Sequence, residues 1–226
     1  MEPFQLADRL RLTVITDEAL ARPRALSDVV REALAAGAPT IQLRLKGASA
    51  RELLEATHRL MPIVRSAGAL LIVNDRLDVA LAAGADGVHL GPDDPPVLDA
   101  RAASGARAAA DAFIVGYSVD SVDGATRAEA EGADYLGVGA VYETAHKSDA
   151  GEVIGLEGLR QVVQAVSIPV VAIGGITPER ARAVAETGAC GCAAIGAVMG
   201  SPEPGDAVRA LLLPFGTATR HPTRLQ

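Results

Sequence analysis

Two apolar runs of this sequence each end in carboxylates. The run LLIVND closes on Asn74 and Asp75, and the run GVHL leads into GPDD, which contains Asp94. Carboxylate oxygens are hard ligands of the kind that Mg²⁺ takes when waters and phosphate oxygens complete its coordination. If the two runs are neighbouring strands, both acids can reach one point, and the pair predicts a Mg²⁺ site beside a phosphate. For Asp75 alone, the alternative is a cap on the helix that follows.

Lysine is scarce in this chain. Lys and Arg together number 21, but lysine stands only at positions 46 and 147. Since arginine supplies the generic positive charge, each lysine is a candidate for a position that needs an ammonium group. The alternative is that both are ordinary surface residues. Lys46 follows the apolar run TIQLRL and Lys147 follows YLGVGAV, and this shared position just past predicted strands favours a role in binding anions.

A glycine pair precedes a predicted helix in the stretch AIGGITPER. Gly174 and Gly175 end an apolar run, Thr177 is a candidate N-cap, and Pro178 suits the first helical position. Glycines let backbone N–H groups approach an oxyanion, and the helix N-terminus adds partial positive charge. The stretch therefore predicts a phosphate site. A tight turn that merely needs glycine is the alternative.

Eight short apolar runs recur along the chain and largely lack alternation, as expected for strands buried on both faces. They span residues 12–16, 40–45, 70–75, 87–90, 113–118, 135–141, 169–175 and 192–198. Helical stretches such as 27–37 and 177–188 separate them, and Gly-Ala pairs recur where a helix passes into a strand. These units predict a single (β/α)8 barrel over residues 1–214, with a flexible tail over 215–226. A doubly wound open sheet is the alternative, but regular units without an inserted domain favour closure.

A barrel of this kind would gather the chemically active side chains, because its active site lies at the C-terminal ends of the strands. The polar residues there are Gln42, Arg44, Lys46, Asn74, Asp75, Asp94, Ser118, Asp120, Thr144, His146 and Lys147. They predict an anionic substrate with a metal-bound polyphosphate on one side of the mouth. A second phosphate is expected near Gly175 and the turn Ile195–Gly196. His89 precedes a strand end and is predicted to be a core or supporting residue.

Composition narrows the classes of function. The net charge is -7, aromatic residues make up 3% and tryptophan is absent, which together disfavour a nucleic-acid partner. No run of about 20 apolar residues occurs, so we expect no membrane span, and the N-terminus lacks the apolar stretch of a signal peptide. Cys190 and Cys192 fit neither a disulfide framework nor a zinc site and are expected in the core. We expect a cytoplasmic protein that acts on small phosphorylated molecules, and the sequence leaves a homo-oligomer open.

Four motifs taken together resemble the thiamine phosphate synthase family. They are TIQLRLK, LLIVNDRLDVALAAGADGVHLG, GADYLGVGAVYET followed by Lys147, and VVAIGGITPER. The resemblance runs from LTVITD to about VMGSPEP, most of the chain. It implies a transferase of thiamine biosynthesis that joins hydroxymethylpyrimidine diphosphate to a thiazole phosphate and releases pyrophosphate, with Mg²⁺ as cofactor. Loss of pyrophosphate leaves a pyrimidinylmethyl cation that the neutral thiazole nitrogen attacks, so no strong general base is needed.

The resemblance also implies roles for individual residues. Gln42, Arg44, Lys46 and Asn74 would hold the pyrimidine substrate, Asp75 and Asp94 the Mg²⁺, Ser118 and Lys147 the diphosphate or pyrophosphate, and Thr144, His146, Gly175, Ile195 and Gly196 the thiazole phosphate. Arg44, Lys46 and Lys147 would be catalytic, because positive charge stabilises the departing pyrophosphate.

The chain departs from the family's usual pattern at several positions. The usual residues are Gln, His, Thr and Ser where this chain has Pro92, Asp120, His146 and Gly196. The segment VYETAHKSDAGEVIGLEGL is also similar to the related thiazole tautomerases, which isomerise a thiazole carboxylate phosphate, use that His and typically lack the metal aspartates. Because this chain keeps both aspartates and lacks that His, the synthase is favoured. A non-catalytic binder of thiazole or pyrimidine phosphates is a third hypothesis, against which the metal ligands and the two lysines argue.

Overall fold

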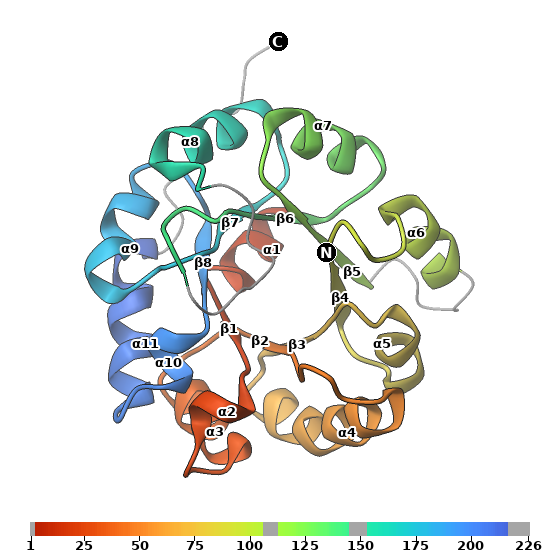
Figure 1. Cartoon of the computed structure of the whole chain (residues 1–226), viewed down its shortest axis with the longest axis vertical. Helices are drawn as coiled ribbons and strands as arrows, with labels where there is room; N and C mark the ends of the chain where they lie inside the picture. Colours follow the sequence, from red (N-terminus) through yellow and green to blue (C-terminus); the bar gives the residue numbers. More distant parts are fainter. Residues whose placement is uncertain (1–2, 106–112, 145–152, 217–226) are drawn as a thin grey trace.

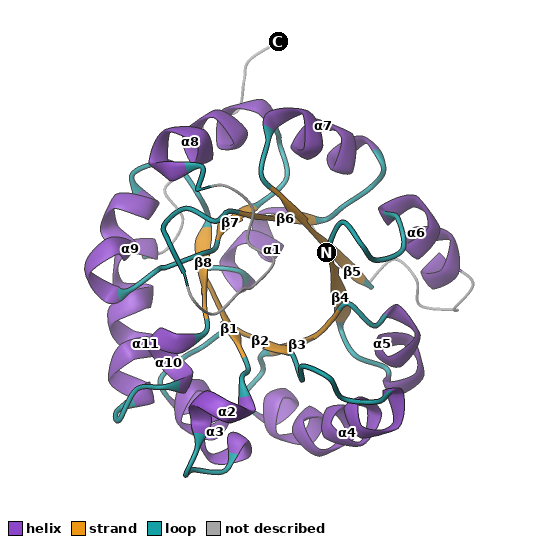
Figure 2. Ribbon diagram, viewed as in Figure 1, coloured by secondary structure: helices purple, strands orange, loops and turns teal. Residues whose placement is uncertain are grey.

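The chain folds into a closed barrel of parallel strands (Figures 1 and 2). The computed structural model describes residues 3–105, 113–144 and 153–216. Each strand pairs with its neighbours in sequence order and β8 pairs with β1, so the sheet has no open edge. The strands are β1 (Leu12–Ile15), β2 (Thr40–Leu43), β3 (Leu70–Asn74), β4 (Gly87–Leu90), β5 (Ile114–Val119), β6 (Tyr135–Val138), β7 (Val170–Ala172) and β8 (Gly191–Ala194). The predicted (β/α)8 barrel is confirmed, and the open sheet is excluded.

Helices surround the barrel and cover its outer face (Figure 2). They are α2 (Glu18–Ala21), α3 (Leu26–Ala35), α4 (Ala50–Ser66), α5 (Leu77–Ala83), α6 (Val97–Gly105), α7 (Val122–Ala130), α8 (Gly155–Ala165), α9 (Pro178–Ala185), α10 (Gly196–Met199), α11 (Pro204–Leu212) and the 3-10 helix η2 (Leu213–Phe215). Thr177 is the N-cap of α9 and Pro178 its first residue, as predicted. Within the described residues, no helix is long and apolar enough to cross a membrane.

A further helix, α1 (Pro3–Arg9), lies within the outline of the barrel in Figure 1. Leu6 and Leu10 are buried together with Leu70 and Ile114, which stand where β3 and β5 begin. The helix therefore closes the end of the barrel at which the strands start. Seven residues are too few to give a clear helical pattern, which explains why the sequence did not predict it.

The strands are buried on both faces, which accounts for their unbroken apolar runs. Side chains of the outer face pack against the helices in one large cluster, whereas a smaller cluster fills the barrel interior. Cys192 is buried in β8, as predicted for a core residue, whereas Cys190 immediately precedes that strand and is only partly buried against the interior cluster. Burial raises the pKa of both thiols to about 12, so they stay protonated at neutral pH.

The recurring Gly-Ala pair marks a joint with a specific hydrogen bond. In two of the joints an aspartate follows the pair: Asp86 accepts from the backbone N–H of Leu71 at 2.7 Å, and Asp134 accepts from that of Val115 at 2.7 Å. Each carboxylate thus ties the start of its own strand to the preceding strand. The pattern seen in the sequence therefore has a structural purpose at the end of the barrel that faces away from the mouth.

Three strands end at least three residues earlier than the sequence suggests. The runs expected over 135–141 and 169–175 leave the sheet after Val138 and Ala172, and the run over 192–198 becomes helix α10 from Gly196. Apolar side chains continue beyond each strand because these segments stay packed against the barrel, so hydrophobicity alone does not mark the strand end. Phe215, the first residue of the expected tail, is buried; residues 217–226 lie outside the described part, and a flexible tail there stays a prediction.

Candidate active site

A buried polar network crosses the barrel interior beneath its mouth. The Nδ1 atom of His89 lies 2.9 Å from the Tyr135 hydroxyl, and its Nε2 atom lies 2.9 Å from the Ser118 hydroxyl. Gln42 completes the chain by a side-chain hydrogen bond to Tyr135. Burial raises the pKa of Tyr135 well above its usual range, the bond from Gln42 opposing that shift only in part, so the phenol is neutral. His89 is thus a supporting residue, as predicted.

Two glycines make room for this network. A Cβ on Gly116 would lie 2.2 Å from Cζ of Tyr135, and one on Gly137 would lie 2.9 Å from Cε1 of His89. Neither distance is compatible with a side chain, so both positions require glycine for packing. The large Tyr135 ring can occupy the interior because the strand beside it carries no side chain there.

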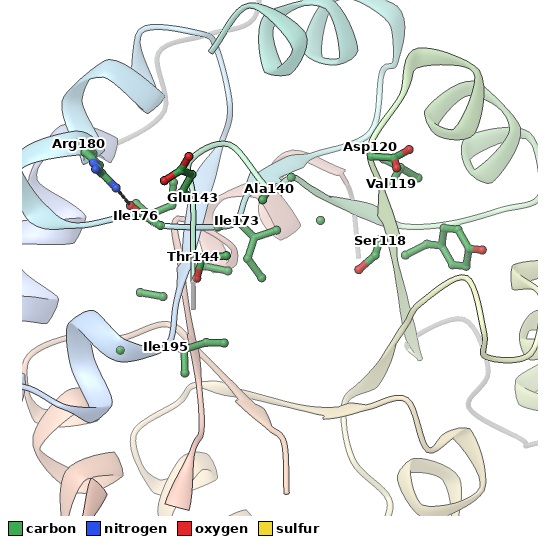
Figure 3. Close-up of a pocket in the computed structure, with 18 of the residues that line it drawn as sticks. Ser118, Val119, Asp120, Ala140, Glu143, Thr144, Ile173, Ile176, Arg180 and Ile195 are labelled. Atoms are coloured by element: carbon green, nitrogen blue, oxygen red, sulfur yellow. Dashed lines mark hydrogen bonds between the residues drawn. The ribbon is translucent and has the colours of Figure 1, made fainter. Parts of the chain in front are cut away.

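A cavity of about 500 Å³ opens above the network at the C-terminal ends of the strands (Figure 3). It brings together five of the predicted substrate-binding residues, namely Ser118, Thr144, Gly175, Ile195 and Gly196. Figure 3 shows Thr144, Glu143 and Ile195 on one side of the opening, and Ser118 and Asp120 on the other. The part of the mouth formed by β5 to β8 is therefore a preformed pocket.

The glycine pair after β7 lies between two loops. Gly174 and Gly175 have φ values of 97° and 62°, and the backbone N–H of Tyr142 donates to the carbonyl of Gly174 at 3.1 Å. A Cβ on Gly175 would lie 2.6 Å from the carbonyl oxygen of Glu143. Packing against the β6 loop thus requires these glycines, as the turn hypothesis states. Their position on the cavity wall is equally compatible with a phosphate bound to their backbone.

The remaining predicted residues that the structure describes stand at the ends of β2, β3 and β4 and do not line this cavity. The backbone of Arg44 is tied to Thr16, whose hydroxyl accepts from Arg44 N–H and donates to Arg44 carbonyl, both at 2.9 Å. The guanidinium of Arg44 lies 3.8 Å from the Asp17 carboxylate. Gln42 is buried, Asn74 is half-buried, and Lys46 is exposed. His146 and Lys147, predicted at the same mouth, lie outside the described residues.

The two predicted metal ligands follow adjacent strands. The backbone N–H of Asp75 donates to the carbonyl of His89 on β4 at 2.8 Å, and the Asp94 carboxylate accepts from the N–H of Gly91 at 2.7 Å. Arg76, and not Asp75, is the N-cap residue of α5. Asp75 adopts φ 62°, a left-handed conformation that is costly for a residue with a side chain and clusters at functional sites. Within the described residues, no three His, Cys, Asp or Glu side chains form a metal cluster.

Four charged residues of the cavity wall were not among the predicted ligands: Asp120, Arg127, Glu143 and Arg180. Asp120 was predicted at the mouth of the barrel and noted as a departure from the family's pattern, but not as a ligand. Arg180 belongs to the quoted motif AIGGITPER, and a cation in the first turn of a helix opposes the helix dipole. This unfavourable position of a cation is the feature of the sequence that could have indicated Arg180 as a ligand.

A (β/α)8 barrel with a pocket at the C-terminal ends of its strands is the architecture of a barrel enzyme. The family model of thiamine monophosphate synthase matches residues 12–198. The chain belongs to this family.

Individual relatives agree with the family model. The chain is 49% identical over 200 residues to the thiamine-phosphate synthase of Methanoculleus marisnigri, covering 88% of this chain and 92% of that protein. It is 50% identical over 200 residues to that of Pyrococcus furiosus, again covering 88% and 92%. A solved thiamine phosphate pyrophosphorylase from Pyrococcus furiosus superimposes with a TM-score of 0.82 at 48% identity, covering 91% of this chain and 95% of that one.

Proposed function

We propose that this chain is a transferase that condenses hydroxymethylpyrimidine diphosphate with a thiazole phosphate and releases pyrophosphate, giving thiamine phosphate. The observation that carries the proposal is the cavity at the mouth of the barrel. It gathers five residues that the sequence predicts to bind substrate. Relatives about half identical over most of their length are thiamine-phosphate synthases, which supports the same reaction.

The cavity over β5 to β8 suits the thiazole phosphate. Its wall offers the Ser118 and Thr144 hydroxyls, the glycine backbone after β7 and the turn at Ile195 and Gly196. Thiazole is a small heteroaromatic ring, and a pocket of apolar walls with a few polar groups is the usual form of such a site. We propose that the phosphate binds at the β7–β8 side and the ring points toward Ser118.

The pyrimidine diphosphate is assigned to the charged residues at the ends of β2 to β4. Arg44, Lys46 and Lys147 are proposed to stabilise the negative charge that grows on the leaving pyrophosphate, and Gln42 and Asn74 to hold the pyrimidine. The buried hydrogen bond between Gln42 and Tyr135 fixes the amide in orientation. The thiazole nitrogen attacks as a neutral nucleophile, so the absence of a proposed general base is consistent with the chemistry.

Asp75 and Asp94 are proposed to hold Mg²⁺ with the diphosphate. The donor set fits: both are carboxylates on neighbouring strand ends, and a single hydrogen bond from Gly91 to Asp94 Oδ2 leaves a second oxygen on that carboxylate. Bound there, Mg²⁺ would neutralise charge on the diphosphate. Two protein carboxylates with phosphate oxygens and water suffice for this ion.

The tautomerase and the non-catalytic binder are not favoured, because the matched relatives are synthases. Asp120 occupies the place of the residue that a tautomerase would use, on the cavity wall opposite Thr144 (Figure 3). The cytoplasmic location and a homo-oligomer stay predictions from the sequence.

The test is an assay of pyrophosphate release with both substrates and Mg²⁺ present, beside a parallel assay of thiazole carboxylate phosphate alone. We expect release of pyrophosphate and formation of thiamine phosphate only when both substrates are added. Isomerisation without metal, accompanied by no condensation, would overturn the proposal.

A further inference from the structure

The wall of the cavity over β7 and β8 has few polar side chains. Apart from Thr177 and Arg180, the lining residues between positions 173 and 197 are isoleucine, glycine and alanine. Gly196 in particular offers only its backbone to a ligand. A phosphate in this part of the cavity would therefore meet neutral backbone donors, and among the described residues there Arg180 is its single source of positive charge.

Arg180 is held at the cavity by two contacts. Its Nη1 atom donates to the carbonyl oxygen of Gly175 at 2.7 Å (Figure 3). Its guanidinium carbon lies 4.5 Å from the centre of the Tyr142 ring. Gly175 leaves the room for this arrangement, since a Cβ there would lie 3.1 Å from Nη1. A guanidinium carries five N–H donors in a rigid plane, so most of them remain for a ligand.

Arg180 forms no salt bridge in the described part of the chain, although its charge also acts on the carboxylate of the adjacent Glu179. Six other arginines there form salt bridges, namely Arg24, Arg44, Arg76, Arg101, Arg160 and Arg209. Arg180 instead contacts a carbonyl and an aromatic ring. It stands in the first turn of α9, where a cation opposes the helix dipole. The stability of the helix therefore does not account for an arginine at this position.

We propose that Arg180 recognises the phosphate of the thiazole substrate and sets the preference for the phosphorylated over the unphosphorylated thiazole. The inference rests on the proposed function and deepens it. The planar fork of arginine matches two oxygens of a phosphate. Glu143 lines the same cavity, and Figure 3 shows it on the Arg180 side. Without Arg180 this side would be negative and would repel a phosphate dianion.

The experiment compares Arg180→Gln with Arg182→Gln, a matched control. Arg182 lies two positions further along α9, is exposed and is not part of the cavity wall. Initial rates are measured with each substrate varied while the other is saturating. For Arg180→Gln we expect KM for the thiazole phosphate to rise about ten- to a hundredfold, as for loss of a charge-assisted hydrogen bond. KM for the pyrimidine diphosphate and kcat should stay within about threefold.

Two further measurements separate recognition from structural support. The unphosphorylated thiazole alcohol is tested as a competitive inhibitor, and its inhibition constant should be the same for wild type and Arg180→Gln. Arg180→Lys keeps the charge without the planar fork and should give an intermediate KM. Equal increases in both KM values, an unchanged KM for the thiazole phosphate, or the same increase in Arg182→Gln would each overturn the proposal.

Failure of the proposed function would appear differently. If wild type releases no pyrophosphate with both substrates, the reaction is wrong, and calorimetric titration with the thiazole phosphate tests Arg180 by itself. Binding to wild type that weakens at least tenfold in Arg180→Gln but not in Arg182→Gln would support the recognition role. Equal binding to all three proteins, or no binding to any, would overturn it.

Discussion

The two halves of the barrel mouth are built in different ways. Over β5 to β8 a cavity is shaped by glycines and backbone, with Gly174 and Gly175 packed tightly on the loop after β6. At the ends of β2 to β4 most of the predicted ligands are charged side chains, none of them lines that cavity, and the Arg44 guanidinium lies 3.8 Å from the Asp17 carboxylate. One half is formed by the fold itself. We propose that the other is completed only when the diphosphate and its cation bind.

This difference follows from the electrostatics of each half. Two carboxylates such as Asp75 and Asp94, or two cations such as Arg44 and Lys46, would repel one another if they were brought together around one ligand. A diphosphate with a bound cation would supply both charges at once. Substitutions in the charged half should therefore act on the chemical step, whereas substitutions in the cavity half should act on binding of the thiazole phosphate.

The largest effect is expected from Asp75→Asn in the charged half. Loss of a metal ligand removes several kcal/mol of charge stabilisation, so kcat should fall by about 10³-fold while the fold is kept. Activity of the wild type should be lost in chelator and restored by Mg²⁺. Asp93→Asn, an exposed acid next to Asp94, is the control and should retain activity. Full turnover of the wild type in excess chelator would contradict the metal site.

The two lysines should give the next largest effect. Lys46→Ala and Lys147→Ala should each slow pyrophosphate release by about 10²-fold, the cost of removing an oriented charge from a leaving group. Pre-steady-state measurement of pyrophosphate release reports that step directly. Arg51→Ala removes an exposed charge at the start of α4 and should leave the rate unchanged. A variant of either lysine with the wild-type rate would show that scarcity of lysine is no guide at that position.

The fold and the charged half could be predicted from sequence for the same reason. Unalternating runs such as LLIVND indicate strands buried on both faces, and a closed parallel barrel places every strand end at one mouth. The position of Asp75 follows from this topology without knowledge of its surroundings. Topology alone does not predict the cavity half, because the shape of the cavity depends on contacts between loops.

Arg180 and Tyr135 illustrate what the sequence could not show. Tyr135 begins β6, and nothing in the run YLGVGAV tells whether its ring points into the barrel or toward the helices. Its inward direction is decided by Gly116 on the neighbouring strand, a contact between residues far apart in the sequence. Arg180 likewise acquires its contacts from Tyr142 and Gly175, which belong to two different loops.

A substitution in the cavity half should act selectively on one substrate. Gly175→Ala places a Cβ 2.6 Å from the Glu143 carbonyl and should distort the wall over β7. We expect KM for the thiazole phosphate to rise about tenfold, with a smaller change in KM for the pyrimidine diphosphate. Gly84→Ala is the matched control, because Gly84 has a similar φ of 69° but nothing within 4 Å of its Cβ position. If Gly84→Ala raises KM for the thiazole phosphate as much as Gly175→Ala does, backbone strain alone explains the effect. The comparison would then not distinguish the two halves of the mouth.

The smallest effect on turnover is expected from Tyr135→Phe, which cuts the network that joins the two halves. Gln42 and His89 each lose a buried partner, so the free energy of unfolding should fall by about 1–3 kcal/mol, while kcat changes less than about tenfold. Since burial raises the folded-state pKa of Tyr135, its contribution to stability is full below the unfolded value of about 10 and declines as the pH rises above it. The two thiols titrate in both proteins and cancel in the comparison. Urea unfolding measures the free energy of unfolding of wild type and Tyr135→Phe at pH 8 and at a pH above 10. We expect the difference between the two proteins to be smaller at the higher pH. A larger difference there would contradict a neutral, buried phenol between Gln42 and His89.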